Sequence, residues 1–139
     1  MITIRKKNDL KGVITSILEK EEDVNFAYLF GSTAKMKSNQ YSDVDIGVYL
    51  SKDIVKKNKF YPEQLAAKIE KKINKPVDVR VLNHQNLIFL HQVLKYGELL
   101  ICKNDKKRIL FETRIYDEYL DFKYYIDQYN KIRRERLSI

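Results

Sequence analysis

The chain has 139 residues, of which 44% are hydrophobic and 33% are charged, and its formal net charge is +8. A chain of this length buries about two-thirds of its unfolded surface, so we expect one domain over residues 1–139. The single cysteine excludes an internal disulfide, and no apolar stretch reaches the ~18 residues of a membrane span. The start of the chain lacks the apolar core of a signal peptide, which favours a cytoplasmic protein with no membrane partner.

The net charge of +8 has two interpretations. It fits a polyanionic partner, such as nucleotide phosphates, nucleic acid or an acidic protein. However, the lysines are scattered along the chain, so they can equally form an ordinary solvated surface. Because no nucleic-acid recognition motif accompanies the charge, we rank nucleic-acid binding last among the possible functions.

The hydrophobic pattern of the first half predicts two helices and two strands. Apolar residues at steps of three and four indicate the first helix, and the segment VNFAYLF is typical of a strand buried on both faces. A polar loop over 38–42 precedes the second strand, which alternates with period two. In chain order, we expect a helix over 9–20, a strand over 24–30, a short helix over 33–37 and a strand over 43–50.

The second half predicts three helices and two strands. Pro62 suits the first turn of a helix, where its missing N–H costs least, and Asn83 suits a helix cap. The C-terminal helix is roughly 45 Å long at ~1.5 Å per residue, so part of it should project or pack on something else. In chain order, we expect a helix over 62–73, a strand over 77–82, a helix over 83–96, a strand over 98–101 and a helix over about 105–136.

These elements predict an α/β (α+β) fold, in which a small, mixed, four-stranded sheet carries helices on one face. The core should span about residues 8–102, and the long C-terminal helix at about 105–136 should be attached to it. We expect the cleft that carries the chemistry to lie on the other face of the sheet.

Two of the predicted strands bring aspartates to the same side of the sheet. Alternate side chains of a strand share a face, so Asp43 and Asp45 point together while their apolar neighbours face the core. The strand at 77–82 repeats this pattern, with Asp78 on the alternate face together with Arg80. If the two strands are neighbours and their apolar faces share one core, all three aspartates converge on the open side.

Such a cluster of carboxylates predicts a metal site. Three carboxylates close together repel one another, and a divalent cation removes that cost. A ligand set made only of oxygen favours Mg²⁺, which usually keeps substrate phosphates in its coordination shell. Gly31 lets the backbone approach a phosphate, and Ser32 and a helix N-terminus can donate hydrogen bonds to it. The arrangement suits in-line attack on a phosphoryl centre with two metal ions.

Each of these features alone has an ordinary explanation. A Gly-Ser pair is usually just a turn, and an Asp-x-Asp pair is usually a solvated strand edge or a capping group. Their joint occurrence at set offsets arises by chance in only about one chain in a thousand of this size, which favours a functional site.

Gly31-Ser32, ten intervening residues and Asp43-Val44-Asp45 resemble the GSx₁₀DxD signature of the polymerase β-type nucleotidyltransferases. Within that superfamily the chain resembles the minimal nucleotidyltransferases, the MNT or MntA-like antitoxins. The segments LFGS, SDVDIGV, PVDVRVL and VLKYGELLI follow the order and spacing of that family, over roughly residues 24–101.

The resemblance implies an adenylyltransferase that acts as the antitoxin of a toxin–antitoxin pair. Family members of this type transfer AMP from ATP, once or several times, to a tyrosine of a HEPN-domain ribonuclease toxin that is usually encoded alongside. By the resemblance, the catalytic residues, which also bind two Mg²⁺ ions, are Asp43, Asp45 and Asp78, the last also helping to deprotonate the acceptor hydroxyl. The nucleotide-binding residues implied in the same way are Gly31, Ser32, Lys35 and Ser42.

The chain departs from the GSRARG sequence that the family often carries. Lys35 and Met36 stand where Arg and Gly are common, and Lys35 lacks the bidentate fork of Arg. The change leaves the metal chemistry intact, and the resemblance therefore does not fix nucleotide affinity or base preference.

Two other functions remain open at this stage. The same chemistry could act on a small molecule, as in aminoglycoside nucleotidyltransferases, although those enzymes generally carry an additional helical domain to shape the acceptor pocket. Alternatively, the protein could neutralise its partner by binding alone, through the long C-terminal helix.

Overall fold

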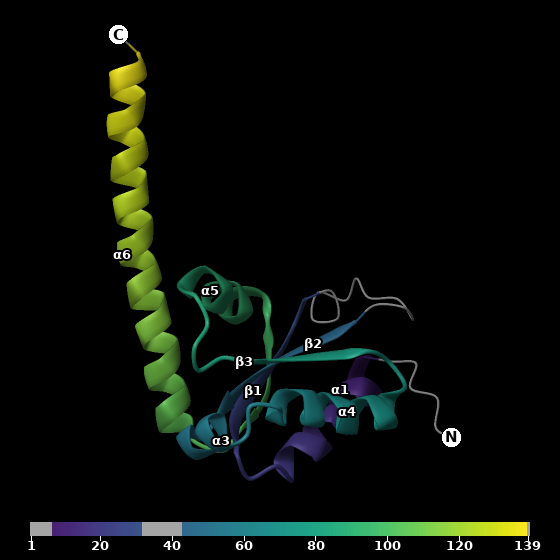
Figure 1. Cartoon of the computed structure of the whole chain (residues 1–139). Coiled ribbons are helices and arrows are strands. Elements are labelled where there is room, and N and C mark those ends of the chain that lie inside the picture. The colour runs from purple at the N-terminus through teal and green to yellow at the C-terminus, as the bar shows by residue number, and fades with distance from the viewer. Residues whose placement is uncertain (1–6, 32–42, 139) are drawn as a thin grey trace.

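The computed structural model describes residues 7–31 and 43–138 of the chain (Figure 1). The short helix expected over 33–37 and the loop expected over 38–42 lie outside the described residues. The elements are α1 (Lys7–Glu19), β1 (Val24–Phe30), β2 (Val44–Leu50), α3 (Lys52–Lys57), α4 (Tyr61–Ile73), β3 (Val77–Val81), α5 (Leu87–Tyr96), β4 (Glu98–Cys102) and α6 (Asp105–Leu137).

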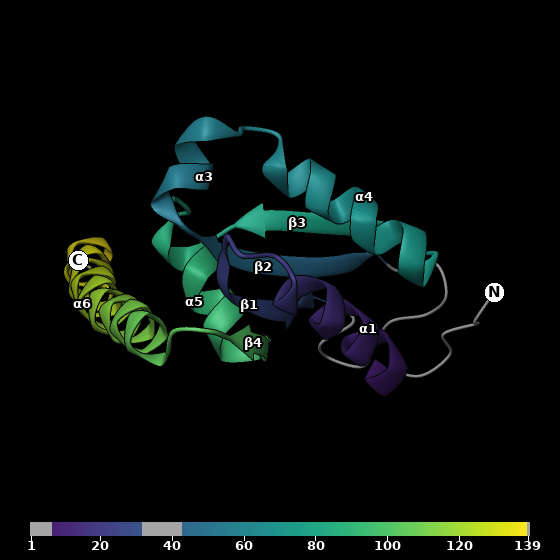
Figure 2. The ribbon, with the colours of Figure 1, turned by 90° about the horizontal axis from the view of Figure 1, so that it is seen from below.

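Four strands form one mixed sheet in the order β3-β2-β1-β4. β1 is antiparallel to both of its neighbours, β2 and β4, whereas β2 and β3 run parallel. A parallel pair needs a crossover connection, and α3 and α4 supply it (Figure 2). The predicted α/β fold with a mixed four-stranded sheet is therefore confirmed.

One face of the sheet packs against α1 and α4, which lie side by side beneath it (Figures 1 and 2). Each helix buries a stripe of apolar residues at steps of four, and β2 contributes every second residue from Val44 to Leu50. The stripe residues are Leu10, Ile14 and Leu18 in α1, and Leu65, Ile69 and Ile73 in α4.

The opposite face of the sheet is partly covered by α5 and the first turns of α6. Its strands present aromatic rings: Phe26 stacks on Tyr49 with ring centroids 4.7 Å apart, and Phe111 of α6 lies 5.3 and 5.2 Å from them. Leu90 and Val93 of α5 complete this second cluster. The expectation of helices on one face is corrected here, because β1 is apolar on both sides and its second face also needs a cover.

Replacement of Tyr28 tests how much its buried hydrogen bond stabilises the aromatic face of the sheet. Its buried side chain donates a hydrogen bond to Glu112 Oε1 at 2.5 Å, and burial together with that carboxylate raises the pKa of the hydroxyl. We expect Tyr28→Phe to lower the free energy of unfolding by roughly 1.5–3 kcal/mol in urea titrations, the range for hydrogen bonds to charged groups. Tyr124→Phe removes an exposed hydroxyl as a control. Equal stability losses in the two variants contradict this prediction.

Two local features differ from the sequence-based expectation. α3 was not predicted, because its six residues are too few to display a helical period. Asn83 does not cap a helix: its side chain accepts a hydrogen bond from Leu50 N and donates one to Leu50 O, both at 2.9 Å. Asn83 thus continues the pairing of β2 with β3, and Asn86 caps α5 by accepting a hydrogen bond from Phe89 N.

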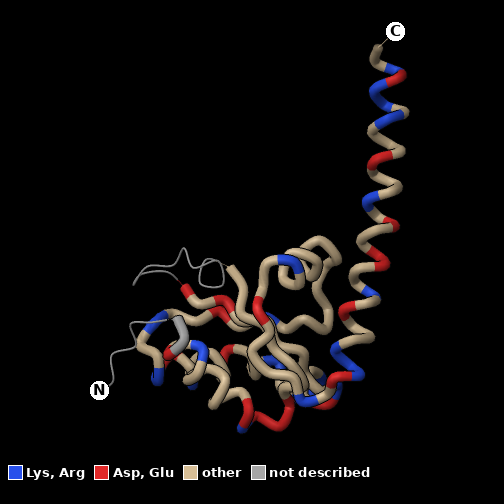
Figure 3. Tube along the Cα trace, turned by 180° about the vertical axis from the view of Figure 1, so that it is seen from behind, with Lys and Arg blue, Asp and Glu red and all other residues tan. Residues whose placement is uncertain are grey.

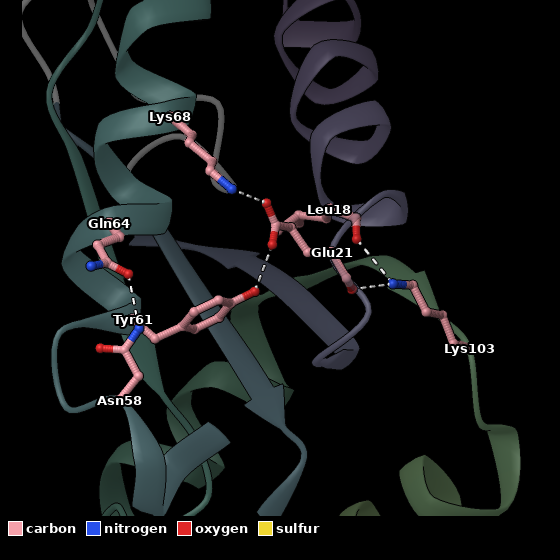
Figure 4. A network of polar contacts seen from close by, with 7 residues as sticks. All are labelled: Leu18, Glu21, Asn58, Tyr61, Gln64, Lys68 and Lys103. Atoms are coloured by element: carbon pink, nitrogen blue, oxygen red, sulfur yellow. Dashed lines mark hydrogen bonds and ion pairs between the residues drawn. The ribbon is translucent and has the colours of Figure 1, made fainter. Parts of the chain in front are cut away.

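A polar network joins α1, α4 and the end of β4 (Figure 4). Glu21 accepts hydrogen bonds from the Tyr61 hydroxyl at 2.9 Å and from Lys68 Nζ at 2.7 Å. Lys103, just after β4, donates to the backbone carbonyls of Leu18 and Glu21. Burial opposes ionisation of Glu21, but its side-chain hydrogen bonds and the nearby lysines lower its pKa overall. The network therefore holds an ionised carboxylate at neutral pH.

α6 extends well beyond the sheet (Figure 1). It buries only Phe111 and Ile115 against the domain, and every described residue from Leu120 onward is exposed. The expectation that part of this helix projects is therefore confirmed. Within the described ranges, no helix has both the length and the apolar character needed to cross a membrane.

Candidate active site

The parallel pairing of β2 with β3 places two of the predicted aspartates next to each other. Asp45 and Asp78 are direct partners in this register, and the neighbouring pair Val44 and Val77 faces the core of α1 and α4. The aspartates therefore lie on the opposite face, as period-two alternation requires. Asp45 is half-buried, the side chain of Asp78 is 49% exposed, and Asp43, directly before β2, is exposed.

Asp78 and Asp43 are both near enough to Asp45 for their charges to affect its pKa. Burial is the largest cause that raises the pKa of Asp45, and the charges of Asp78 and Asp43 raise it further. Arg80 acts in the opposite direction. Two further negative charges near one half-buried carboxylate are an unfavourable arrangement in the absence of a cation.

Gly31 brings the end of β1 against this carboxylate. Its φ of +77° lies in the left-handed region that favours glycine, and the preceding residue, Phe30, pairs with Asp45 across the sheet. A Cβ at position 31 would overlap Asp45 Oδ2 and lie 3.2 Å from Asp45 Cγ. The glycine is therefore required by both its backbone conformation and the closeness of Asp45.

The structure brings four of the seven predicted site residues into one place. Asp43, Asp45 and Asp78 gather at the ends of β2 and β3, and Gly31 lies against them. The other three predicted residues lie outside the described part of the chain, and their roles stay predictions. These residues are Ser32, Lys35 and Ser42.

Arg80 is a site residue that the sequence analysis did not single out. Its Nε donates to Asp78 Oδ2 at 3.2 Å, and its guanidinium carbon lies 5.3 Å from the ring centroid of Phe89. Phe89 in turn meets Phe30 edge-to-face at 5.5 Å. The signal was present in the sequence, because residues 78 and 80 share one face of a strand.

The donor set fits a hard divalent cation, because it consists of carboxylate oxygens on one face of the sheet. Among the described residues, however, no group of three or more His, Cys, Asp or Glu side chains is arranged to hold a metal ion. The ion pair with Arg80 occupies Asp78 Oδ2. Mg²⁺ at this site would therefore share Asp78 with Arg80, through the other carboxylate oxygen, Oδ1.

Asp45→Asn tests the electrostatic cost of the cluster. The pKa of Asp45 is raised in the folded protein. The folded state therefore becomes less stable as pH rises from the unfolded-state pKa through the folded-state pKa. At neutral pH the ionised Asp45 thus destabilises the metal-free protein. We expect Asp45→Asn to raise the melting temperature in EDTA at neutral pH. We also expect added Mg²⁺ to raise the melting temperature of the wild type more than that of the variant. A variant that melts below the wild type in EDTA contradicts this prediction.

Comparison with known proteins identifies the family to which the chain is similar. The family model described as "Polymerase beta, Nucleotidyltransferase" matches residues 13–106, which is more than half of the chain and includes all four strands. A comparison with curated proteins yields no match.

Solved structures share the fold. A chain from a crystal structure of a toxin–antitoxin with AMP-PNP is 22% identical, with a TM-score of 0.69 over 81% of this chain and 88% of that chain. A second is from a tri-AMPylated Shewanella oneidensis HEPN toxin in complex with MNT antitoxin, at 20% identity, TM-score 0.66, and 84% and 89% coverage. A third, from the toxin–antitoxin MntA-HepT, is 21% identical, with a TM-score of 0.60 over 83% and 88%. At these identities the likeness shows the fold.

Proposed function

The chain belongs to the polymerase β nucleotidyltransferase family, and we propose that it is a Mg²⁺-dependent adenylyltransferase that moves AMP from ATP to a tyrosine of a HEPN ribonuclease toxin. It thereby acts as the antitoxin of a toxin–antitoxin pair, whose toxin is encoded by the adjacent gene, and it works in the cytoplasm. The observation that carries this proposal is the cluster of Asp43, Asp45 and Asp78 beside Gly31 on one face of the sheet.

The structural neighbours support the nucleotide and the partner. One neighbour was solved with AMP-PNP, an analogue of ATP, and another with a HEPN toxin that carries three AMP groups. This chain shares their fold and carries the carboxylates that the chemistry needs. The fold shared with these complexes favours adenylyl transfer to a protein over transfer to a small molecule.

Each residue of the site has a task in this proposal. Asp43 and Asp45 would hold Mg²⁺, and Asp78 would complete the metal site. Gly31 allows the phosphates to approach the backbone at the end of β1, where a side chain would collide with Asp45. Mg²⁺ bound at these carboxylates supplies neutralisation of the triphosphate and of the charge that develops on the leaving group.

The transfer is a substitution at phosphorus. The tyrosine oxygen of the partner attacks the α-phosphorus of ATP and forms a new P–O bond, while the bond to the β-phosphate oxygen breaks and pyrophosphate leaves. The proton of the tyrosine hydroxyl passes toward Asp78, which acts as a general base. Arg80, which pairs with Asp78, places a positive charge beside the site.

A labelling experiment tests the proposal. The purified chain is incubated with α-labelled ATP, Mg²⁺ and the HEPN protein encoded by the adjacent gene. We expect label on the HEPN protein and mass increments of whole AMP groups, both lost when EDTA is added. Replacement of the acceptor tyrosine by Phe is the control. Absence of label on the HEPN protein contradicts the proposal, and label on an aminoglycoside in a parallel incubation favours the small-molecule alternative.

A further inference from the structure

The projecting part of α6 carries an apolar stripe that no other described residue covers. Tyr119 is the last ring of α6 held by the domain, since it stacks on His91 with centroids 3.4 Å apart. Beyond it, Phe122, Ile126 and Tyr129 are 39%, 41% and 62% exposed. These four positions follow one another at steps of three, four and three, which is the spacing of a coiled-coil seam.

The charges of the projecting segment divide at its midpoint. Residues 117–127 contain four acidic residues and one lysine, whereas residues 128–137 contain four basic residues and one glutamate. Figure 3 shows this division along α6, where the blue segments gather toward the C-terminus. One half of the segment therefore carries a net charge of −3 and the other half +3.

We propose that α6 pairs in antiparallel orientation with α6 of a second copy of this chain. A two-fold axis between positions 127 and 128 sets Ile126 of one copy opposite Tyr129 of the other. Each half of charge −3 then lies along a half of charge +3, whereas a parallel pair sets like charges side by side. The two domains lie at opposite ends of the pair, because the C-terminal end of each helix reaches the level of Tyr119 in the other.

The ends of the stripe fit the same orientation. Heptad spacing continues the seam to Arg133 and Arg136. In the antiparallel register, Arg133 falls opposite Phe122 of the second copy and Arg136 falls opposite Tyr119. A guanidinium against an aromatic ring is favourable, whereas a parallel pair places each of these arginines against its own counterpart. The stripe is therefore complementary to itself in one orientation.

Sedimentation equilibrium of the full chain tests the pairing. We expect a concentration-dependent species of twice the mass of one chain. The double variant Ile126→Asp/Tyr129→Asp, which places charges in the seam, is expected to remain monomeric at concentrations where the wild type is dimeric. The matched control Leu120→Asp/Tyr124→Asp removes exposed apolar residues outside the seam and should dimerise as the wild type does. A monomeric wild type, including one that associates only with a HEPN protein, overturns the proposal.

Cysteine cross-linking tests the orientation. In a Cys102→Ser background, Phe122→Cys and Arg133→Cys variants are mixed and oxidised with oxidised glutathione. We expect disulfide-linked dimers in the mixture and none in either variant alone, since identical positions are separated by roughly 16 Å along the helix axis. Disulfides within each variant alone indicate a parallel pair and overturn the proposal.

Discussion

Replacing both Asp43 and Asp45 by Asn is expected to lower the rate of AMP transfer by at least about 100-fold, because the loss of partners outside the first coordination shell already costs 10–100-fold. The substitution keeps the shape of both side chains and removes their charge. The fold should survive, since Asp43 is exposed and the charge on Asp45 is unfavourable in the absence of metal. Labelled-ATP transfer to the HEPN protein measures the effect, and the melting temperature verifies the fold.

The control for this variant is Asp9→Asn/Asp53→Asn, which removes two exposed carboxylates from α1 and α3. It has the same change in net charge and should keep wild-type activity. Two results contradict the prediction: a double site variant that transfers AMP at more than a tenth of the wild-type rate, or equal losses in the two variants. If the site variant loses transfer but still neutralises the toxin fully, binding alone is sufficient for the antitoxin effect.

Gly31→Ala is expected to reduce both stability and activity. A residue with a side chain costs about 1–2 kcal/mol in the left-handed region, and the new methyl group would overlap Asp45 Oδ2. Either Asp45 or the end of β1 must then move. A misplacement of about 1 Å can cost up to 100-fold in rate. We therefore expect the rate of AMP transfer to fall even under conditions where the variant remains fully folded. Urea unfolding and labelled-ATP transfer measure the two effects separately.

Gly12→Ala is the matched control for this substitution. Gly12 lies inside α1, its φ is not positive, and no atom lies within 4 Å of the position that a Cβ would take. The same chemical change should therefore stabilise the protein there by roughly 0.5–1 kcal/mol, the usual difference between Gly and Ala inside a helix. A Gly31→Ala variant that behaves like Gly12→Ala in both measurements contradicts the described site.

The arrangement of the aspartates could be predicted from the sequence because it depends on local periodicity. Alternation along a strand places Asp45 on the other face of the sheet from Val44, and Asp78 on the other face from Val77. The apolar faces then had to share one core, which required the two strands to be neighbours. Likewise, helical spacing at the C-terminus was enough to predict a helix longer than the domain.

Contacts between distant residues could not be predicted in this way. Asn is a residue type that often caps helices, which is why Asn83 was predicted to do so. Its actual partners, the backbone N and O of Leu50, lie next to it only after β2 and β3 have paired. α5 and α6 pack on the aromatic face of the sheet, and this packing depends on the positions of both helices relative to the strands. The ion pair of Arg80 with Asp78 uses one of the two carboxylate oxygens, and side-chain spacing alone does not reveal such a contact.

The most direct test of the active site is a crystal structure of the chain with AMP-PNP and Mn²⁺, whose anomalous scattering locates the metal independently of the protein. We expect Mn²⁺ coordinated by oxygens of Asp43, Asp45 and Asp78, with the triphosphate beside Gly31. Metal bound away from these aspartates, or nucleotide bound away from Gly31, contradicts the assignment of the site.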